Sequence, residues 1–148
     1  MSTAHITFTK GAGKFDQMTV HRADGDEVVA CPKQRIIPHD MAHYAVEHTL
    51  GRRGFLSRVR EGEVAAFRMQ PDAESDAVER LVEVFQGDAW SGGTSAPQDL
   101  LDLYHVTCAA RACQPLAVTL ADLAAVRAAF QALDAQWQAL PVGLPLAL

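Results

Sequence analysis

The sequence predicts an α+β fold in which a small antiparallel β-meander is followed by about four or five helices. Near the N-terminus apolar and polar residues alternate, which is typical of half-buried strands. From residue 38 onward the apolar residues recur at intervals of three and four, which is typical of amphipathic helices. With 148 residues, we expect a single domain, β-rich over residues 1–35 and helical over residues 36–148.

The β-rich part is expected to contain about three strands. Alternating residues indicate one strand near residues 6–8 and another near 18–20, and a short apolar run at 28–31 indicates the third. Between the second and third strands, Asp24-Gly25 predicts a tight hairpin, because glycine accepts the positive φ that such turns require. Strands joined in this way form a meander.

The first helix is predicted over residues 38–50. Pro38 suits the first helical position, where no backbone donor is needed, and Gly51 suits the residue just past the end. A short helix at 55–61 and an amphipathic helix that includes Val78 and Phe85 are expected next. A loop is predicted over 87–97, followed by a helix through residues 101–108.

The last helix, which begins near Thr119, carries a straight apolar seam over residues 123–140. Its members alternate in steps of three and four: Leu123, Val126, Phe130, Leu133, Trp137 and Leu140. The seam either packs on the core of the domain or forms the interface of a homo-oligomer. The apolar tail after Pro141 is costly to leave in water, so we expect it to lie against the core or a partner.

Charge and composition exclude several classes of protein. The formal net charge of -5 argues against nonspecific binding to nucleic acid or to anionic membranes. No apolar run approaches the roughly 18 residues of a membrane span, and the N-terminus lacks the apolar centre of a secretory signal. The three cysteines give no disulfide framework. We therefore expect a cytoplasmic protein with reduced cysteines.

The segment 36–51, IIPHDMAHYAVEHTLG, holds the candidate functional residues. At about 100° per residue, His43, Glu47 and Asp40 lie at about 40°, 80° and 100° from His39 around the helix. These four residues share one polar stripe on a helix that is otherwise largely apolar. We expect the helix to pack on the sheet with the stripe facing outward to a cleft.

This stripe predicts a metal site. Two histidines four residues apart can reach one zinc ion from consecutive helical turns, so His39 and His43 are the expected ligands of Zn²⁺. Glu47, on the same stripe, is the predicted third ligand. Side chains from other elements are alternatives for that third position: His21, His105, Glu61 and Glu63.

The segment from His39 to His43, HDMAH, resembles the HExxH motif of zincin metallopeptidases, with Asp40 in the place of the glutamate. In that family both histidines bind zinc and the acid between them acts as general base toward the metal-bound water. The resemblance implies that His39 and His43 are ligands and that Asp40 is the catalytic base. Aspartate is one methylene shorter, which removes roughly 1.5 Å of reach.

Two other resemblances involve the same residues. The His39-Asp40 doublet resembles that of HD-type phosphohydrolases, which also use an earlier histidine on a helix, whereas His5 and His21 here lie in predicted strands. The segment PHDMAHYAVEHTLGRRGFLSRVREGE resembles a group of bacterial proteins with a P-H-D-x-x-H-x-x-V-E pattern. That resemblance extends over roughly the first 70 residues; it implies the β-then-α layout and no particular reaction.

The leading hypothesis is therefore a metal-dependent, zincin-like hydrolase that acts on a small molecule or peptide. A hypothesis from another class is a non-catalytic domain that binds a small molecule or a protein, with the stripe lining a pocket. In a third, the domain is structural and its histidines only complete hydrogen bonds.

Overall fold

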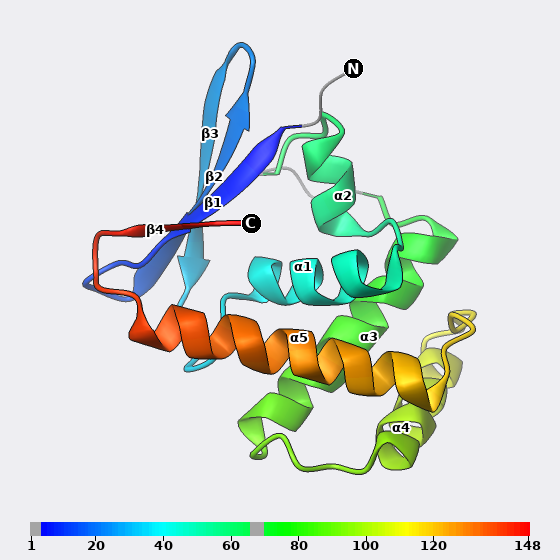
Figure 1. The fold of residues 1–148 in the computed structure, drawn as a ribbon. Helices are drawn as coiled ribbons and strands as arrows, with labels where there is room; N and C mark the ends of the chain where they lie inside the picture. The colour runs from blue at the N-terminus through cyan, green and yellow to red at the C-terminus, as the bar shows by residue number, and fades with distance from the viewer. Residues whose placement is uncertain (1–3, 66–69) are drawn as a thin grey trace.

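Three N-terminal strands pair in chain order in the computed structural model, which describes residues 4–65 and 70–148 (Figure 1). Strands β1 (His5–Thr9), β2 (Phe15–Arg22) and β3 (Gly25–Pro32) are antiparallel. The β1–β2 register places Phe8 opposite Met18, and β2 and β3 are joined at Gly25, where φ is 134°. The predicted meander and its glycine turn are confirmed.

A fourth strand comes from the apolar tail. Strand β4 (Pro145–Ala147) pairs antiparallel with β1 and places Leu146 opposite Phe8, so the sheet order is β3-β2-β1-β4. The tail therefore adds one strand to the three of the predicted N-terminal meander. The tail packs against the core as expected, and it covers an edge of β1 whose backbone groups would otherwise be open to pairing with another chain.

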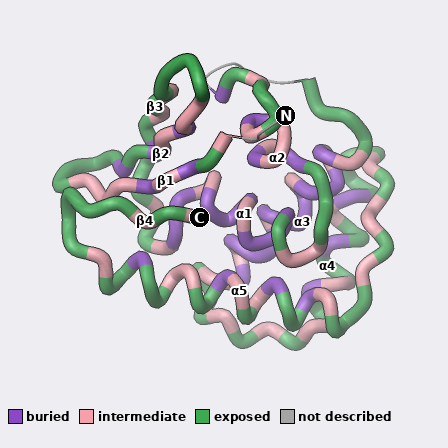
Figure 2. The backbone as a smooth tube through the Cα atoms, turned by 45° about the horizontal axis from the view of Figure 1, so that its top comes forward, coloured by how far each residue is buried: buried purple, intermediate pink, exposed green. Residues whose placement is uncertain are grey.

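One face of the sheet supplies part of the core. Alternate residues of β1 and β2 are buried: Ile6, Phe8, Met18 and Val20. They belong to the same apolar cluster as the inward-facing side chains of the helices. Figure 2 shows that the buried segments gather around α1, between the sheet and the other helices. The β-rich and helical parts thus share one core.

The described chain contains five helices: α1 (His39–Leu50), α2 (Phe55–Arg60), α3 (Ala73–Trp90), α4 (Pro97–Ala110) and α5 (Leu120–Ala139). Helix α1 follows Pro38 and ends at Gly51, whose left-handed φ of 62° is the conformation that favours glycine there. The predicted loop over 87–97 begins too early, because α3 continues through Gly87 to Trp90.

Helix α1 lies at the centre of the molecule, against α2, α3 and α5 (Figure 1). Its apolar residues Met41, Ala45 and Val46 are buried as predicted. The expectation that its polar stripe faces outward is wrong, because His43 is only 1% exposed and Glu47 only 4%. Helices α2 and α3 cover the part of the stripe formed by His43 and Glu47, whereas the side chain of His39 is 41% exposed.

The seam of α5 packs on this chain's own core. Leu123, Val126, Phe130 and Trp137 are buried, and the remaining seam residues lie partly buried against them. A homo-oligomer through the helix of residues 123–140 stays a prediction. None of the helices in the described ranges has the length and apolar character needed to cross a membrane.

Lys10, just after β1, ties the sheet to the end of α5. Its ammonium group donates to the carbonyl oxygens of Trp137, at 2.7 Å, and Leu140, at 3.0 Å. A positive charge at a helix C-terminus also interacts favourably with the helix dipole. We predict that Lys10→Met lowers the free energy of unfolding by about 1–2 kcal/mol in urea titrations. Lys14→Met, at an exposed position of the same loop, is the control and should change it little.

Candidate metal centre

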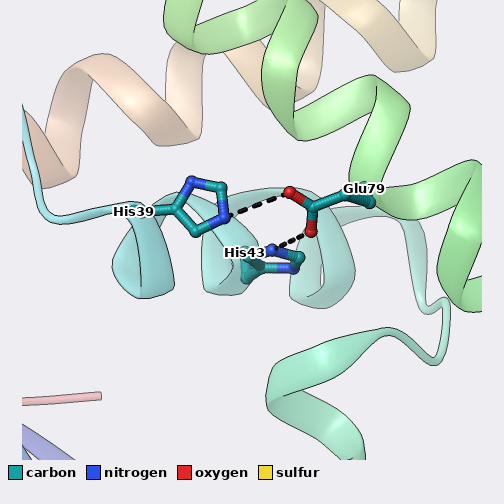
Figure 3. Close-up of side chains that lie close together, drawn as sticks. All are labelled: His39, His43 and Glu79. Atoms are coloured by element: carbon teal, nitrogen blue, oxygen red, sulfur yellow. Dashed lines mark ion pairs between the residues drawn. The ribbon is translucent and has the colours of Figure 1, made fainter. Parts of the chain in front are cut away.

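Three side chains from two helices converge in the interior (Figure 3). His39 and His43 come from α1, and Glu79 comes from α3. The Nε2 atom of His39 lies 3.1 Å from one oxygen of Glu79, and the Nε2 atom of His43 lies 2.6 Å from the other. One candidate ligand atom from each residue lies within 4.8 Å of the other two. The structure thus brings the two predicted histidines together with a carboxylate that was not predicted.

The position of Glu79 on α3 explains how it reaches α1. It lies beside the apolar stripe of α3, next to buried Val78 and one turn before buried Val82. Gln86 follows two helical turns later on nearly the same side, at about 20° from Glu79. Because the apolar stripe of α3 packs on α1, these two polar side chains at its margin face the histidines. In the sequence, Glu79 and Gln86 are two polar residues seven positions apart at the margin of an apolar stripe. This spacing was the signal that could have predicted their contact with α1.

The Nδ1 atom of His43 is fixed as a donor by Glu47, which lies 3.0 Å away. The Glu47 carboxylate accepts backbone N–H groups of Gly54, Leu56 and Ser57 at 3.1, 3.1 and 2.8 Å. It also accepts the Ser57 hydroxyl at 2.5 Å. A carboxylate surrounded by donors in this way is ionised and can only accept. The ring proton therefore lies on Nδ1 of His43, toward Glu47.

A chain of amides fixes His39 in the same way. The Gln34 amide nitrogen donates to the Ile37 carbonyl at 2.7 Å, so the identity of that nitrogen is settled. The same nitrogen lies 2.8 Å from Gln86 Oε1, which must then be the oxygen. That oxygen lies 3.1 Å from Nδ1 of His39. Nδ1 of His39 is therefore also a donor.

These assignments leave both Nε2 atoms facing the Glu79 carboxylate. A neutral imidazole with its proton on Nδ1 presents a lone pair at Nε2. Two lone pairs that point at a carboxylate repel it, so the arrangement requires a cation between them. The cation is either a proton on each Nε2 atom or one metal ion shared by the three side chains.

The pKa values of the metal-free cluster reflect this pairing. Burial lowers the pKa of His43, but the hydrogen bonds to Glu47 and Glu79 outweigh it and raise that pKa to about 9. Burial also lowers the pKa of His39, but the hydrogen bond to Glu79 outweighs this effect and raises that pKa above its usual value. Burial raises the pKa of Glu79, yet its bonds to the two histidines hold it well below the usual range. The Glu47 pKa is likewise lowered, against the effect of burial, chiefly by His43 and Ser57.

The cluster reaches the molecular surface on one side only. The side chain of His39 is 41% exposed and that of Glu79 is 28% exposed, while His43 is almost completely buried. Both outer partners, Glu47 and Gln86, are buried. Solvent or a ligand can therefore approach the three converging atoms from the side of His39 and Glu79.

Asp40, the predicted base, lies toward the sheet. One of its oxygens is 4.0 Å from the sulfur of Cys31 in β3, and it is not a member of the three-residue cluster. Burial raises its pKa above the usual value for aspartate. The role of Asp40 as a general base stays a prediction.

The other predicted ligands lie apart from the cluster. Glu47 borders it on the far side of the His43 ring, bound to Nδ1 rather than to Nε2. The alternatives from other elements have their own surroundings. His21 contacts Thr7 and Asp26, Glu61 pairs with Arg53, Glu63 pairs with Arg58, and His105 is exposed on α4. In the described ranges, Glu79 is the carboxylate that completes the group of three.

Comparisons with protein-family models, with curated proteins and with solved structures find no match to this chain. The resemblances in the sequence therefore rest on short segments alone. A function has to be argued from the geometry of the cluster.

Gly54 is the residue that lets α2 approach the cluster. A Cβ atom at this position would lie 2.7 Å from Glu47 Oε2 and 2.7 Å from Val78 Cγ1. We predict that Gly54→Ala lowers the free energy of unfolding by about 1–3 kcal/mol, the usual cost of overpacking. Gly13→Ala is the matched control, because nothing lies within 4 Å of its added Cβ. Equal stability of the two variants in urea would contradict the close packing around Glu47.

The charge network predicts how the stability of the metal-free protein depends on pH. The pKa of His43 rises from 6.5 to about 9 on folding, so its contribution is complete below pH 6.5 and is lost as the pH rises through 9. The lowered pKa values of Glu47 and Glu79 give a contribution that is present above their usual value of 4.5 and is lost in acid. We expect maximal stability between these limits in chelator-treated protein, followed by a decline toward pH 9.

The control for this prediction is His43→Gln, which removes the titrating ring. Urea unfolding of this variant should show a flatter dependence over the range from about pH 6 to 9. A wild-type protein whose stability is constant over that range would contradict the protonated state assigned to His43.

Proposed function

We propose that this protein is a metal-dependent hydrolase in which His39, His43 and Glu79 hold one zinc ion. The observation that carries the proposal is the orientation of the two imidazole rings. Both Nδ1 atoms are committed as donors to Glu47 and Gln86, so both Nε2 atoms face Glu79, and a neutral ring held in this way has its lone pair on Nε2. This is the tautomer that a metal ligand requires.

The composition and charge of the site support zinc. Two imidazoles and one carboxylate form a ligand set that catalytic zinc sites use. Together with ionised Glu47, the two neutral rings and Glu79 carry two negative charges, which one divalent ion balances. Three protein ligands leave a coordination position for water or substrate, and the exposed side of His39 and Glu79 supplies the access.

In this proposal Glu47 positions His43 and is not itself a ligand. Its two oxygens already accept hydrogen bonds from α2 and from Nδ1 of His43. A carboxylate behind a histidine ligand fixes the ring orientation and increases its basicity. Gln86 has the corresponding place behind His39.

Hydrolysis is the reaction that this ligand set supports best. A zinc ion bound in this way lowers the pKa of a bound water and polarises a carbonyl group. Asp40 directly follows His39 in α1, and its raised pKa favours accepting a proton closer to neutral pH. We propose Asp40 as the base and a small molecule or peptide as the substrate.

The competing function is a non-catalytic domain in which the cluster joins α1 to α3. It is favoured by the burial of His43 and by its pKa of about 9, and two protonated rings, His39 and His43, balance the charges of Glu47 and Glu79. In that case the cation is a pair of protons, and the protein needs no metal. The metal content of the purified protein separates the two functions.

Elemental analysis of protein prepared without a histidine tag is predicted to show close to one equivalent of zinc. His39→Ala and Glu79→Gln should each lower the bound zinc at least tenfold, because each removes one of three ligands. Asp40→Asn should keep the zinc. Glu83→Gln is the matched control: it lies one turn beyond Glu79 on α3, pairs with Arg80, and should also keep the zinc.

Two results would contradict the proposal. One is a metal-free protein whose melting temperature changes neither with added zinc nor with a chelator. The other is zinc binding that is unaffected by Glu79→Gln, which would place the ion elsewhere. Circular dichroism of each variant checks that the fold is retained.

A further inference from the structure

A concave site lies between the C-terminal half of α1 and α2. It has a volume of about 350 Å³, within the range of pockets that bind small molecules. Basic and aromatic side chains dominate its walls: Tyr44, His48, Arg52, Arg53 and Arg60. None of the three cluster residues lines this pocket. Glu47 lines the pocket and also binds Nδ1 of His43, so it lies between the two sites.

The two carboxylates of this pocket already have partners. Glu61 accepts a hydrogen bond of 2.6 Å from Nε of Arg53, which accounts for one arginine and one acid. Glu47 directs its oxygens toward the backbone of α2 and toward His43. Neither acid therefore pairs with Arg52 or Arg60.

Two guanidinium groups keep donors for a ligand. Arg60 donates from Nε to the carbonyl oxygen of Ala4 at 3.2 Å, and no carboxylate in the described ranges forms an ion pair with it. Arg52 lies 3.8 Å from the nearest oxygen of Glu74, which is beyond hydrogen-bond distance. The terminal nitrogens of both side chains can therefore bind an oxyanion.

The opposite wall carries a stack of two rings. Tyr44 and His48, one turn apart on α1, lie with ring centroids 4.9 Å apart and planes at 10°. The stack adds a phenol hydroxyl and an imidazole N–H, both able to donate to an anion, and a flat apolar surface. The donors come from α1, from the loop after it and from α2, and several donors around one site suit the oxygens of a phosphate group.

We propose that this pocket binds the phosphate group of a small organic ligand, with Arg52 and Arg60 as its main contacts and the Tyr44–His48 stack beside its organic part. The inference goes beyond the proposed hydrolase, because it uses none of His39, His43 and Glu79. The arginines of the pocket form a local site for an anion on a protein whose net charge is negative.

Isothermal titration calorimetry of chelator-treated protein with inorganic phosphate tests the proposal. We expect saturable binding at one site. Arg60→Gln and Arg52→Gln should each weaken it roughly tenfold or more, as for the loss of a hydrogen bond between charged groups. Arg111→Gln, at an exposed position at the end of α4, is the matched control and should bind like the wild type. His39→Ala should also bind phosphate normally, whatever its effect on zinc.

Three outcomes would overturn the proposal. The first is wild-type protein without saturable phosphate binding. The second is equal weakening in Arg111→Gln and Arg60→Gln, which would mean general electrostatic attraction. The third is tighter binding of acetate than of phosphate, which would assign the pocket to carboxylates. Melting curves of all the variants check that weakened binding does not come from unfolding.

Discussion

The structure depends on one buried interaction, the imidazole of His43 held between Glu47 and Glu79. His43 has almost no exposure, and its two ring nitrogens lie 3.0 and 2.6 Å from the two carboxylates. Burying charged groups is costly unless each is paired and hydrogen-bonded, so neither acid is stable there without the ring and its cation. Because Glu47 belongs to α1 and Glu79 to α3, this requirement fixes how the two helices cross.

The same requirement places α2. Glu47 accepts the first backbone N–H groups of that helix, which have no partner within the helix itself. Gly54 leaves room for this contact, since a side chain there would occupy the space of the carboxylate. The Glu47 and the Gly54-Phe55 turn of the segment PHDMAHYAVEHTLGRRGF are thus parts of one contact. The presence of Glu47 and Gly54 in that segment has a structural reason that holds with or without catalysis.

Local patterns predicted most of the fold, because each of them reports on its own element. Alternation gave the meander, and Pro38 with Gly51 gave the limits of α1 to within one residue. The helical wheel placed His39 and His43 on one side of the helix, as the structure has them. It could not tell which elements would cover that side, so the stripe was expected outward although it is buried.

Long-range contacts were beyond these patterns. Glu79 lies in an ordinary amphipathic helix, and only the packing of α3 across α1 brings it to the histidines. Strand β4 is a similar case, since an apolar tail is equally compatible with packing on a core or on a partner. The tail pairs with the free edge of β1, and that edge forms only when the sheet has folded.

Burial differs between the residues that converge and the residues that orient them. Glu47 and Gln86, which orient the rings, are 4% and 5% exposed. Two of the three converging residues, His39 and Glu79, are much more exposed than these supports. An ion pair that only joins two helices gains from excluding water from all of its charged atoms, because water weakens their attraction. Here the orienting groups are dry, His43 is buried with them, and His39 and Glu79 reach the surface, which is compatible with the rigid support that a binding site needs.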